Sequence, residues 1–224
     1  MFVGHYAPAF VAAAIDRRSP TLGKLFVAAQ LVDFAFFGLS LTGIERFRIV
    51  PGATVISPFD LYHMPYSHSL LGTLGFAAAW AVAARLLGAS WRAAHLGAAV
   101  VASHWLLDWL VHAPDLTILG YGPRFGLGLW NHPFVEMPLE LALVALAATC
   151  YASRTANLSG GWGAAFSLGA LLAALAFVQF VEWLGPKPSA PIDPPPVSVP
   201  LSALAVYIAL ACLAAWTAQT RSPA

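Results

Sequence analysis

Residues 95–111 read HLGAAVVASHWLLDWLV, an apolar run that is interrupted by two histidines and one aspartate. Such a run is typical of a membrane-spanning helix, in which an ionisable side chain is costly to bury and therefore marks a candidate functional site. His104, Asp108 and His112 follow one another at four-residue spacing. Because neighbours in such a series share one face of a helix, the pattern predicts metal-ligand side chains inside a membrane bundle.

The composition of the whole chain indicates the same class of protein. Of its 224 residues, 59% are hydrophobic and only 9% are charged, whereas a soluble domain carries about 25% charged residues. The mean hydropathy is +0.74. The net charge of +1 gives no indication of nucleic-acid binding. We therefore expect the lipid bilayer, and no nucleic acid, as partner, and a single integral membrane domain over residues 1–224.

Apolar segments predict an all-α, polytopic membrane helix bundle of about six spans plus a short N-terminal helix. The expected spans are 22–44, 66–87, 95–111, 134–151, 162–184 and 199–218. Residues 1–15 would extend only about 22 Å as a helix, which is too short to cross a bilayer alone. Residues 185–200 are rich in proline, which predicts an extended connector between the last two spans.

Basic residues are divided unevenly between the two ends of these spans. One end collects Arg17, Arg18, Lys24, Arg85, Arg92, Arg154 and Arg221, and the other collects Arg46, Arg48, Arg124 and Lys187. The positive-inside rule places the larger group in the cytoplasm. The segments 45–66, 113–133 and 185–198, expected to be loops, would then face outward.

Further histidines and acids fall at this outward end: His63, His68, His132, Glu136 and Glu140. Imidazole and carboxylate are ligands that hold Zn²⁺, Mn²⁺ or iron. His104 and His112 would lie about 12 Å apart along a helix and cannot both bind one ion. Either two metals share Asp108, or one histidine has another role. His132 and Glu136 are candidates for ligands of a second metal or for residues that hydrogen-bond to the ligands.

Several motifs in this part of the chain resemble those of a known family. They are Gly4-His5, Leu31-Val32-Asp33, His63-Met64-Pro65-Tyr66-Ser67-His68-Ser69, Ser103-His104-Trp105-Leu106-Leu107-Asp108 and Gly128-Leu129-Trp130-Asn131-His132-Pro133. Their order is similar to that of the bacterial inner-membrane metal-dependent hydrolases, the YdjM-like, LexA-binding hydrolases, over about residues 1–140. The resemblance implies a multi-pass bacterial inner-membrane protein with metal ligands at His5, Asp33, His68, His104 and Asp108, and with His63 close by.

The chain departs from the family's pattern at two places. Met64 and Pro65 stand where the family has Arg-Gly, and the second acid of its Pro-Asp-x-Asp element falls at Ala35. If the family's arginine binds a substrate phosphate, that role is either vacant in this chain or passes to Arg46, Arg48 or Arg124.

The function expected from these residues is metal-dependent hydrolysis of an ester or phosphoester, acting on a lipid or lipid-linked substrate. Zn²⁺ is the favoured ion, with Mn²⁺ and iron as alternatives. His63 or His112 would serve as general base. Arg46, Arg48 and Arg124 would bind an anionic head group. Two alternatives stay open: a haem or di-iron redox protein, and a non-catalytic subunit of a membrane complex or a transporter.

Overall fold

The computed structural model describes residues 1–15, 18–158 and 162–223, and most of them are helical. The helices are η1 (Val3–Tyr6), α1 (Ala7–Ala13), α2 (Leu22–Ala29), α3 (Leu31–Leu41), α4 (Leu70–Leu86), α5 (Trp91–Val111), η2 (Leu129–Asn131), α6 (Pro133–Arg154), α7 (Gly163–Leu184) and α8 (Ser198–Thr220). Three antiparallel strand pairs are formed by β1 (Arg46–Ile49) with β2 (Phe59–His63), β3 (Leu116–Thr117) with β4 (Arg124–Phe125), and β5 (Thr155–Asn157) with β6 (Arg221–Pro223). Arg17, counted above in the cytoplasmic group, lies outside the described residues.

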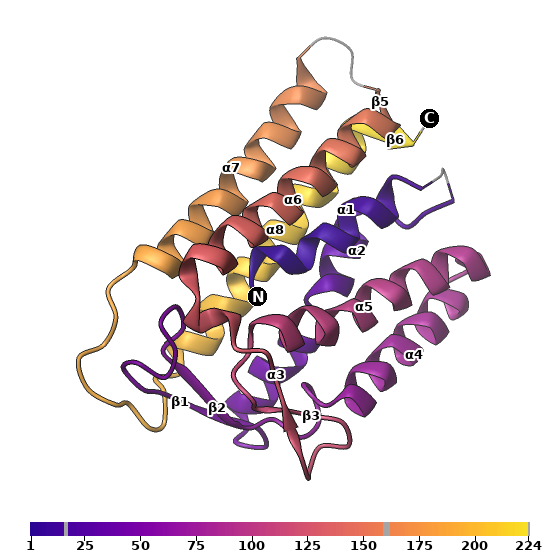
Figure 1. Cartoon of the computed structure of the whole chain (residues 1–224). Helices are drawn as coiled ribbons and strands as arrows, with labels where there is room; N and C mark the ends of the chain where they lie inside the picture. The colour runs from indigo at the N-terminus through magenta and orange to yellow at the C-terminus, as the bar shows by residue number, and fades with distance from the viewer. Residues whose placement is uncertain (16–17, 159–161, 224) are drawn as a thin grey trace.

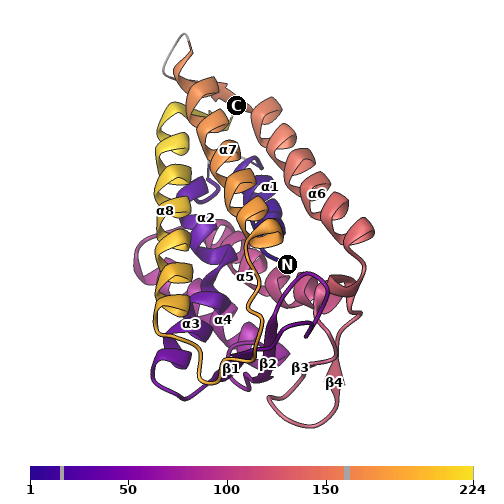
Figure 2. The same ribbon diagram turned by 90° about the vertical axis from the view of Figure 1, so that its left-hand side faces the viewer.

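The helices form one bundle with two hairpins at one end. α4 packs against α5, α7 packs against α8, and α2 lies between α8 and α5. The hairpins β1–β2 and β3–β4 lie together at one end in both views, and β5 and β6 lie at the opposite end (Figures 1 and 2). The short segment η1–α1 packs against α2, α5 and α6, and its Val3, Tyr6 and Phe10 are almost fully buried.

The number of membrane spans differs from the prediction of about six. Within the described ranges, four helices, α5 to α8, are long and apolar enough to cross a membrane, and α2 and α3 together make a fifth candidate that is bent by 51°. The span expected at 66–87 corresponds to α4, which has 17 residues and extends only about 25 Å. α4 is short because Ser69 accepts a hydrogen bond from the N–H of Gly72 and so caps the helix at Leu70. The expected loops 45–66 and 113–133 contain the hairpins β1–β2 and β3–β4.

The bend between α2 and α3 brings polar groups into the bundle interior. The carbonyl oxygen of Ala29 accepts a hydrogen bond from His104 Nδ1 of α5 at 2.8 Å. Gln30, fully buried at the bend, donates to the carbonyl of Phe2 at 3.4 Å. An interrupted membrane helix is tolerated where its freed backbone groups find partners inside the protein. The bend therefore places Asp33, one turn further on, beside α5.

Glu140 on α6 holds the N-terminal segment in the bundle. Its Oε1 accepts hydrogen bonds from the backbone N–H groups of Phe2 at 2.6 Å and Gly4 at 2.9 Å. Gln179 of α7 accepts one from the N–H of Val3 at 3.2 Å. Because His5 follows directly in η1, these bonds fix the position of His5 against α5.

Glu140→Ala is expected to lower the free energy of unfolding by about 2–3 kcal/mol, because the substitution leaves two buried N–H groups without an acceptor. Denaturant unfolding of the detergent-purified protein measures the change. Glu140→Gln keeps one acceptor oxygen and should cost less. Wild-type stability in the alanine variant would show that Glu140 does not anchor this segment.

Candidate metal centre

Four histidines and two aspartates converge inside the bundle. They are His5 from η1, Asp33 from α3, His68 from the segment before α4, His104 and Asp108 from α5, and His112 from the C-terminal cap of α5. All are buried except Asp33, whose side chain is 15% exposed. Segments that lie far apart in the chain thus supply one compact set of imidazoles and carboxylates.

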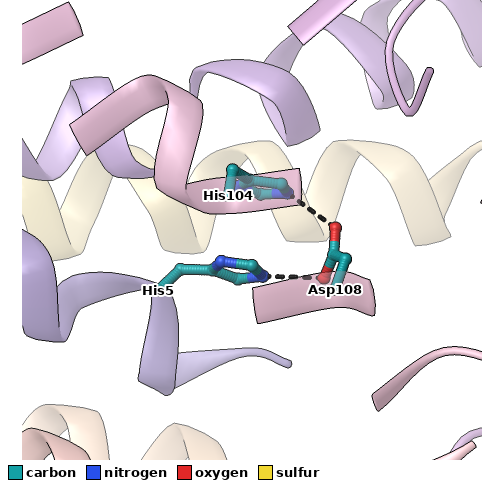
Figure 3. Close-up of side chains that lie close together, drawn as sticks. All are labelled: His5, His104 and Asp108. Carbon is teal, nitrogen blue, oxygen red and sulfur yellow. Dashed lines mark hydrogen bonds and ion pairs between the residues drawn. The ribbon is translucent and has the colours of Figure 1, made fainter. Parts of the chain in front are cut away.

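Asp108 is the centre of this cluster. Its Oδ1 lies 2.9 Å from Nε2 of His5 and 3.4 Å from Nε2 of His112. Its Oδ2 lies 3.1 Å from Nε2 of His104 and 3.6 Å from Nε2 of His68. Figure 3 shows the rings of His5 and His104 stacked, with the carboxylate of Asp108 beyond their Nε2 ends. Each oxygen of Asp108 therefore faces a different pair of imidazoles.

Asp33 completes the cluster on the side of α3. Its Oδ1 lies 3.3 Å from Nε2 of His68 and 3.6 Å from Nε2 of His104. Its Oδ2 accepts a hydrogen bond from the hydroxyl of Tyr207 at 3.2 Å. Two overlapping groups could hold a metal ion: His5, His104 and Asp108, and Asp33, His68 and His104. In each group the ligand atoms lie within 4.8 Å of one another.

The outer nitrogens of two imidazoles are held by groups that only accept hydrogen bonds. Nδ1 of His104 contacts the carbonyl oxygen of Ala29, and Nδ1 of His112 lies 2.9 Å from Oδ1 of Asp115. Nδ1 must therefore carry the proton in both rings. In the neutral ring, Nε2 then offers a lone pair toward the carboxylates. Such an outer partner is typical of histidines that ligate metals.

Unpaired atoms in the cluster are consistent with a cation. Nε2 of His104 and Oδ2 of Asp108 are buried, and neither has a hydrogen-bond partner among the described residues, although the two atoms lie only 3.1 Å apart. A lone pair that faces an anionic oxygen is repelled unless a cation lies between them. The residues present therefore fit a divalent ion bound by nitrogen and oxygen.

Several of the predicted site residues lie away from this cluster. Exposed positions are occupied by His63 at the end of β2, Arg46 and Arg48 on β1, Arg124 on β4, and His132 before α6. Side chains alternate between the two faces of a strand, and β1 directs Phe47 and Ile49 inward, so Arg46 and Arg48 point outward. Arg48 forms an ion pair with Asp60 at 2.7 Å. The structure therefore does not bring these residues to the buried carboxylates.

Glu136 is a different case. It is fully buried on α6, and no group in the described part of the chain forms a hydrogen bond with either of its carboxylate oxygens. Among the described residues it does not belong to either His/Asp group. Glu136 stays a candidate for a ligand of a second metal or for a residue that hydrogen-bonds to the ligands.

A cavity of about 80 Å³ lies beside the cluster. Its polar lining consists of Asp33, Ser57, His68, Asp108, His112 and Glu182. Its other walls are mainly apolar and aromatic, and include Phe36, Phe59, Trp130 and Tyr207. Among the described residues, neither an arginine nor a lysine lines it. The space beside the candidate metal site therefore combines carboxylates and imidazoles with aromatic walls.

Two contributors to the cluster were not identified from the sequence. Asp115 is typical of a turn residue, but its carboxylate contacts His112. Its position three residues after that histidine is the sequence signal that could have indicated this contact. Tyr207 contacts Asp33 from 174 positions away, and no local pattern indicates that pairing.

Comparisons of the chain with protein-family models, with curated proteins and with solved structures find no match. The fold and the site therefore define the class of protein: a mainly helical protein with four or five candidate membrane spans and a buried His/Asp cluster that could hold a metal ion.

Proposed function

We propose that this protein is a membrane-embedded, metal-dependent hydrolase that cleaves an ester or phosphoester in a lipid or lipid-linked substrate. The observation that carries the proposal is the convergence of four Nε2 atoms on the carboxylates of Asp33 and Asp108 in a buried cluster. The motifs that resemble the YdjM-like hydrolases support the same function. Zn²⁺ is the favoured ion because imidazole and carboxylate ligands suit it, and Mn²⁺ and iron are alternatives.

The residues around the cavity suggest how the reaction would proceed. A divalent ion, when bound, supplies an activated water and polarises the scissile group. In the proposal, His5, Asp33, His68, His104 and Asp108 are its ligands.

His112 is the favoured general base in this scheme. It lines the cavity, and Asp115 holds its Nδ1–H, so its Nε2 is free to accept a proton. His63 is exposed and lines a different depression, together with Arg124. The proposal therefore assigns the base to His112 rather than to His63.

The surroundings of the cluster favour a substrate with an apolar group near the scissile bond. The cavity walls are aromatic on one side. Arg46, Arg48 and Arg124 are exposed on the hairpins β1–β2 and β3–β4. These two hairpins lie together at one end of the bundle (Figure 2). In the proposal these arginines contact an anionic head group at the membrane surface, away from the scissile bond. This end faces outward from the plasma membrane if the larger group of basic residues is cytoplasmic.

Haem binding is less well supported by the geometry. The Nε2 atoms of the four histidines lie 2.9–3.6 Å from carboxylate oxygens of Asp33 and Asp108, whereas an axial histidine of haem faces the iron of the macrocycle. A di-iron carboxylate site would need glutamates among the ligands. Glu140 instead accepts hydrogen bonds from backbone N–H groups.

Elemental analysis and hydrolysis assays on the protein purified in mild detergent test the proposal. We expect bound zinc, manganese or iron and hydrolysis of p-nitrophenyl butyrate or bis-p-nitrophenyl phosphate, and we expect His68→Ala to abolish both. His95→Ala is the matched control, because His95 is exposed and stacks on Trp91, away from the cluster. Folded wild-type protein without metal would contradict the proposal, and a Soret absorption band would indicate haem instead.

A further inference from the structure

Ser67 links a buried carboxylate to the metal cluster. Its Oγ lies 2.8 Å from Nδ1 of His68 and 2.5 Å from Oε2 of Glu45. Glu45 and Ser67 are completely buried, and His68 is 4% exposed. Glu45 lies just before β1, and Ser67 and His68 lie just before α4. Two segments outside the long helices are therefore joined behind one of the proposed ligands.

The other oxygen of Glu45 shapes the same segment. Oε1 accepts hydrogen bonds from the backbone N–H groups of Tyr66 at 2.8 Å and Ser67 at 2.9 Å. Thr73 of α4 donates from its hydroxyl to the carbonyl of Ser67 at 3.3 Å. With three donors on its two oxygens, the buried carboxylate of Glu45 is well satisfied without a cation.

The direction of these hydrogen bonds follows from what each group can donate. An ionised carboxylate only accepts, so the single hydroxyl proton of Ser67 goes to Glu45. The oxygen of Ser67 is then an acceptor toward His68, and Nδ1 of His68 must carry the ring proton. Nε2 of His68 consequently offers its lone pair toward Oδ1 of Asp33 and Oδ2 of Asp108, 3.3 and 3.6 Å away.

We infer that Glu45 is a positioning residue of the metal centre, which acts through Ser67 to hold His68 in the tautomer and orientation that present Nε2 to the ion. The inference rests on the proposed metal-binding function. It extends the site beyond its ligands, because Glu45 does not line the cavity beside the cluster. It also accounts for a buried carboxylate that neither the motifs nor the proposed chemistry explains.

Zinc affinity, measured by competition with a chelator in detergent, tests the inference. Ser67→Ala and Glu45→Gln are each expected to raise the Kd about 10- to 100-fold, as is usual when the outer partner of a ligating histidine is removed. The double variant should bind no more than about threefold more weakly than Ser67→Ala, because both changes interrupt one chain of hydrogen bonds. Ser67→Thr retains the hydroxyl and should recover most of the affinity.

The visible absorption of the cobalt-substituted protein provides a second readout, because it depends on how the ligands surround the ion. We expect altered bands in Ser67→Ala and wild-type bands in Ser67→Thr. Ser69→Ala is the matched control: Ser69 is buried in the same segment, but it caps α4. That change should lower the unfolding temperature, because a helix cap is lost, and leave the Kd unchanged.

The outcomes separate the inference from the function on which it rests. Wild-type affinity in Ser67→Ala, in a protein that does bind zinc, would overturn the role of Glu45 and leave the proposed function standing. An equal loss of affinity in Ser69→Ala would also overturn it, since the effect would then be a general disturbance of the segment. A wild-type protein that binds no ion would instead overturn the proposed function.

Discussion

Asp108→Asn is expected to abolish stoichiometric metal binding, with a loss of affinity greater than about 100-fold, which is the upper range for changes confined to the outer partners of a ligand. The carboxylate of Asp108 is the group that all four imidazoles approach. Asparagine keeps the shape of the side chain but removes its negative charge and replaces one oxygen with a group that only donates. Elemental analysis of the purified variant measures the effect.

Asp60→Asn is the matched control for this experiment. Asp60 carries the same functional group, but it pairs with the exposed Arg48 on the hairpin. An exposed ion pair contributes little, about 0–1 kcal/mol, so this variant should keep both its fold and its metal. Full metal content in Asp108→Asn would show that Asp108 is not a ligand.

Removing the ion is expected to destabilise the folded protein. An ion that binds only the folded state adds about 2.7 kcal/mol of stability when its free concentration is 100 times the Kd. Without the ion, the lone pair of His104 Nε2 faces Oδ2 of Asp108 at 3.1 Å, and within the described part of the chain neither atom has a hydrogen-bond partner. Thermal unfolding of wild-type protein with and without a chelator measures the difference.

Asp108→Asn again supplies the internal comparison. If the ion stabilises the protein through this cluster, the chelator should lower the unfolding temperature of the wild type and leave that of the variant unchanged. An equal decrease in both proteins would place the stabilising ion at a different site.

Part of the candidate site could be predicted because helical spacing is a local property. His104 and Asp108 lie four residues apart, and α5 presents both to the same interior region. Arg46 and Arg48 lie in a segment that the sequence predicts as a loop. The segment instead forms strand β1, in which side chains alternate between two faces, and both arginines point outward.

The bend between α2 and α3 illustrates what local patterns do not contain. Residues 22–44 form an apolar run without proline, and one continuous span was expected there. The bend is stabilised by His104, which donates to the carbonyl of Ala29 from 75 positions away. The choice between a straight and a broken helix thus depends on a partner in another element.

The amino-acid sequence by itself determined the membrane class, through its scarcity of charge, and the pairing of His104 with Asp108, through helical periodicity. The sequence motifs implied His5, Asp33 and His68 only through a resemblance. The tertiary structure brings these residues and His112 to Asp108, and it leaves His63 and the arginines apart from it. The physical reason is that periodicity specifies the face of an element on which a side chain lies, whereas the packing of distant elements specifies what that face meets.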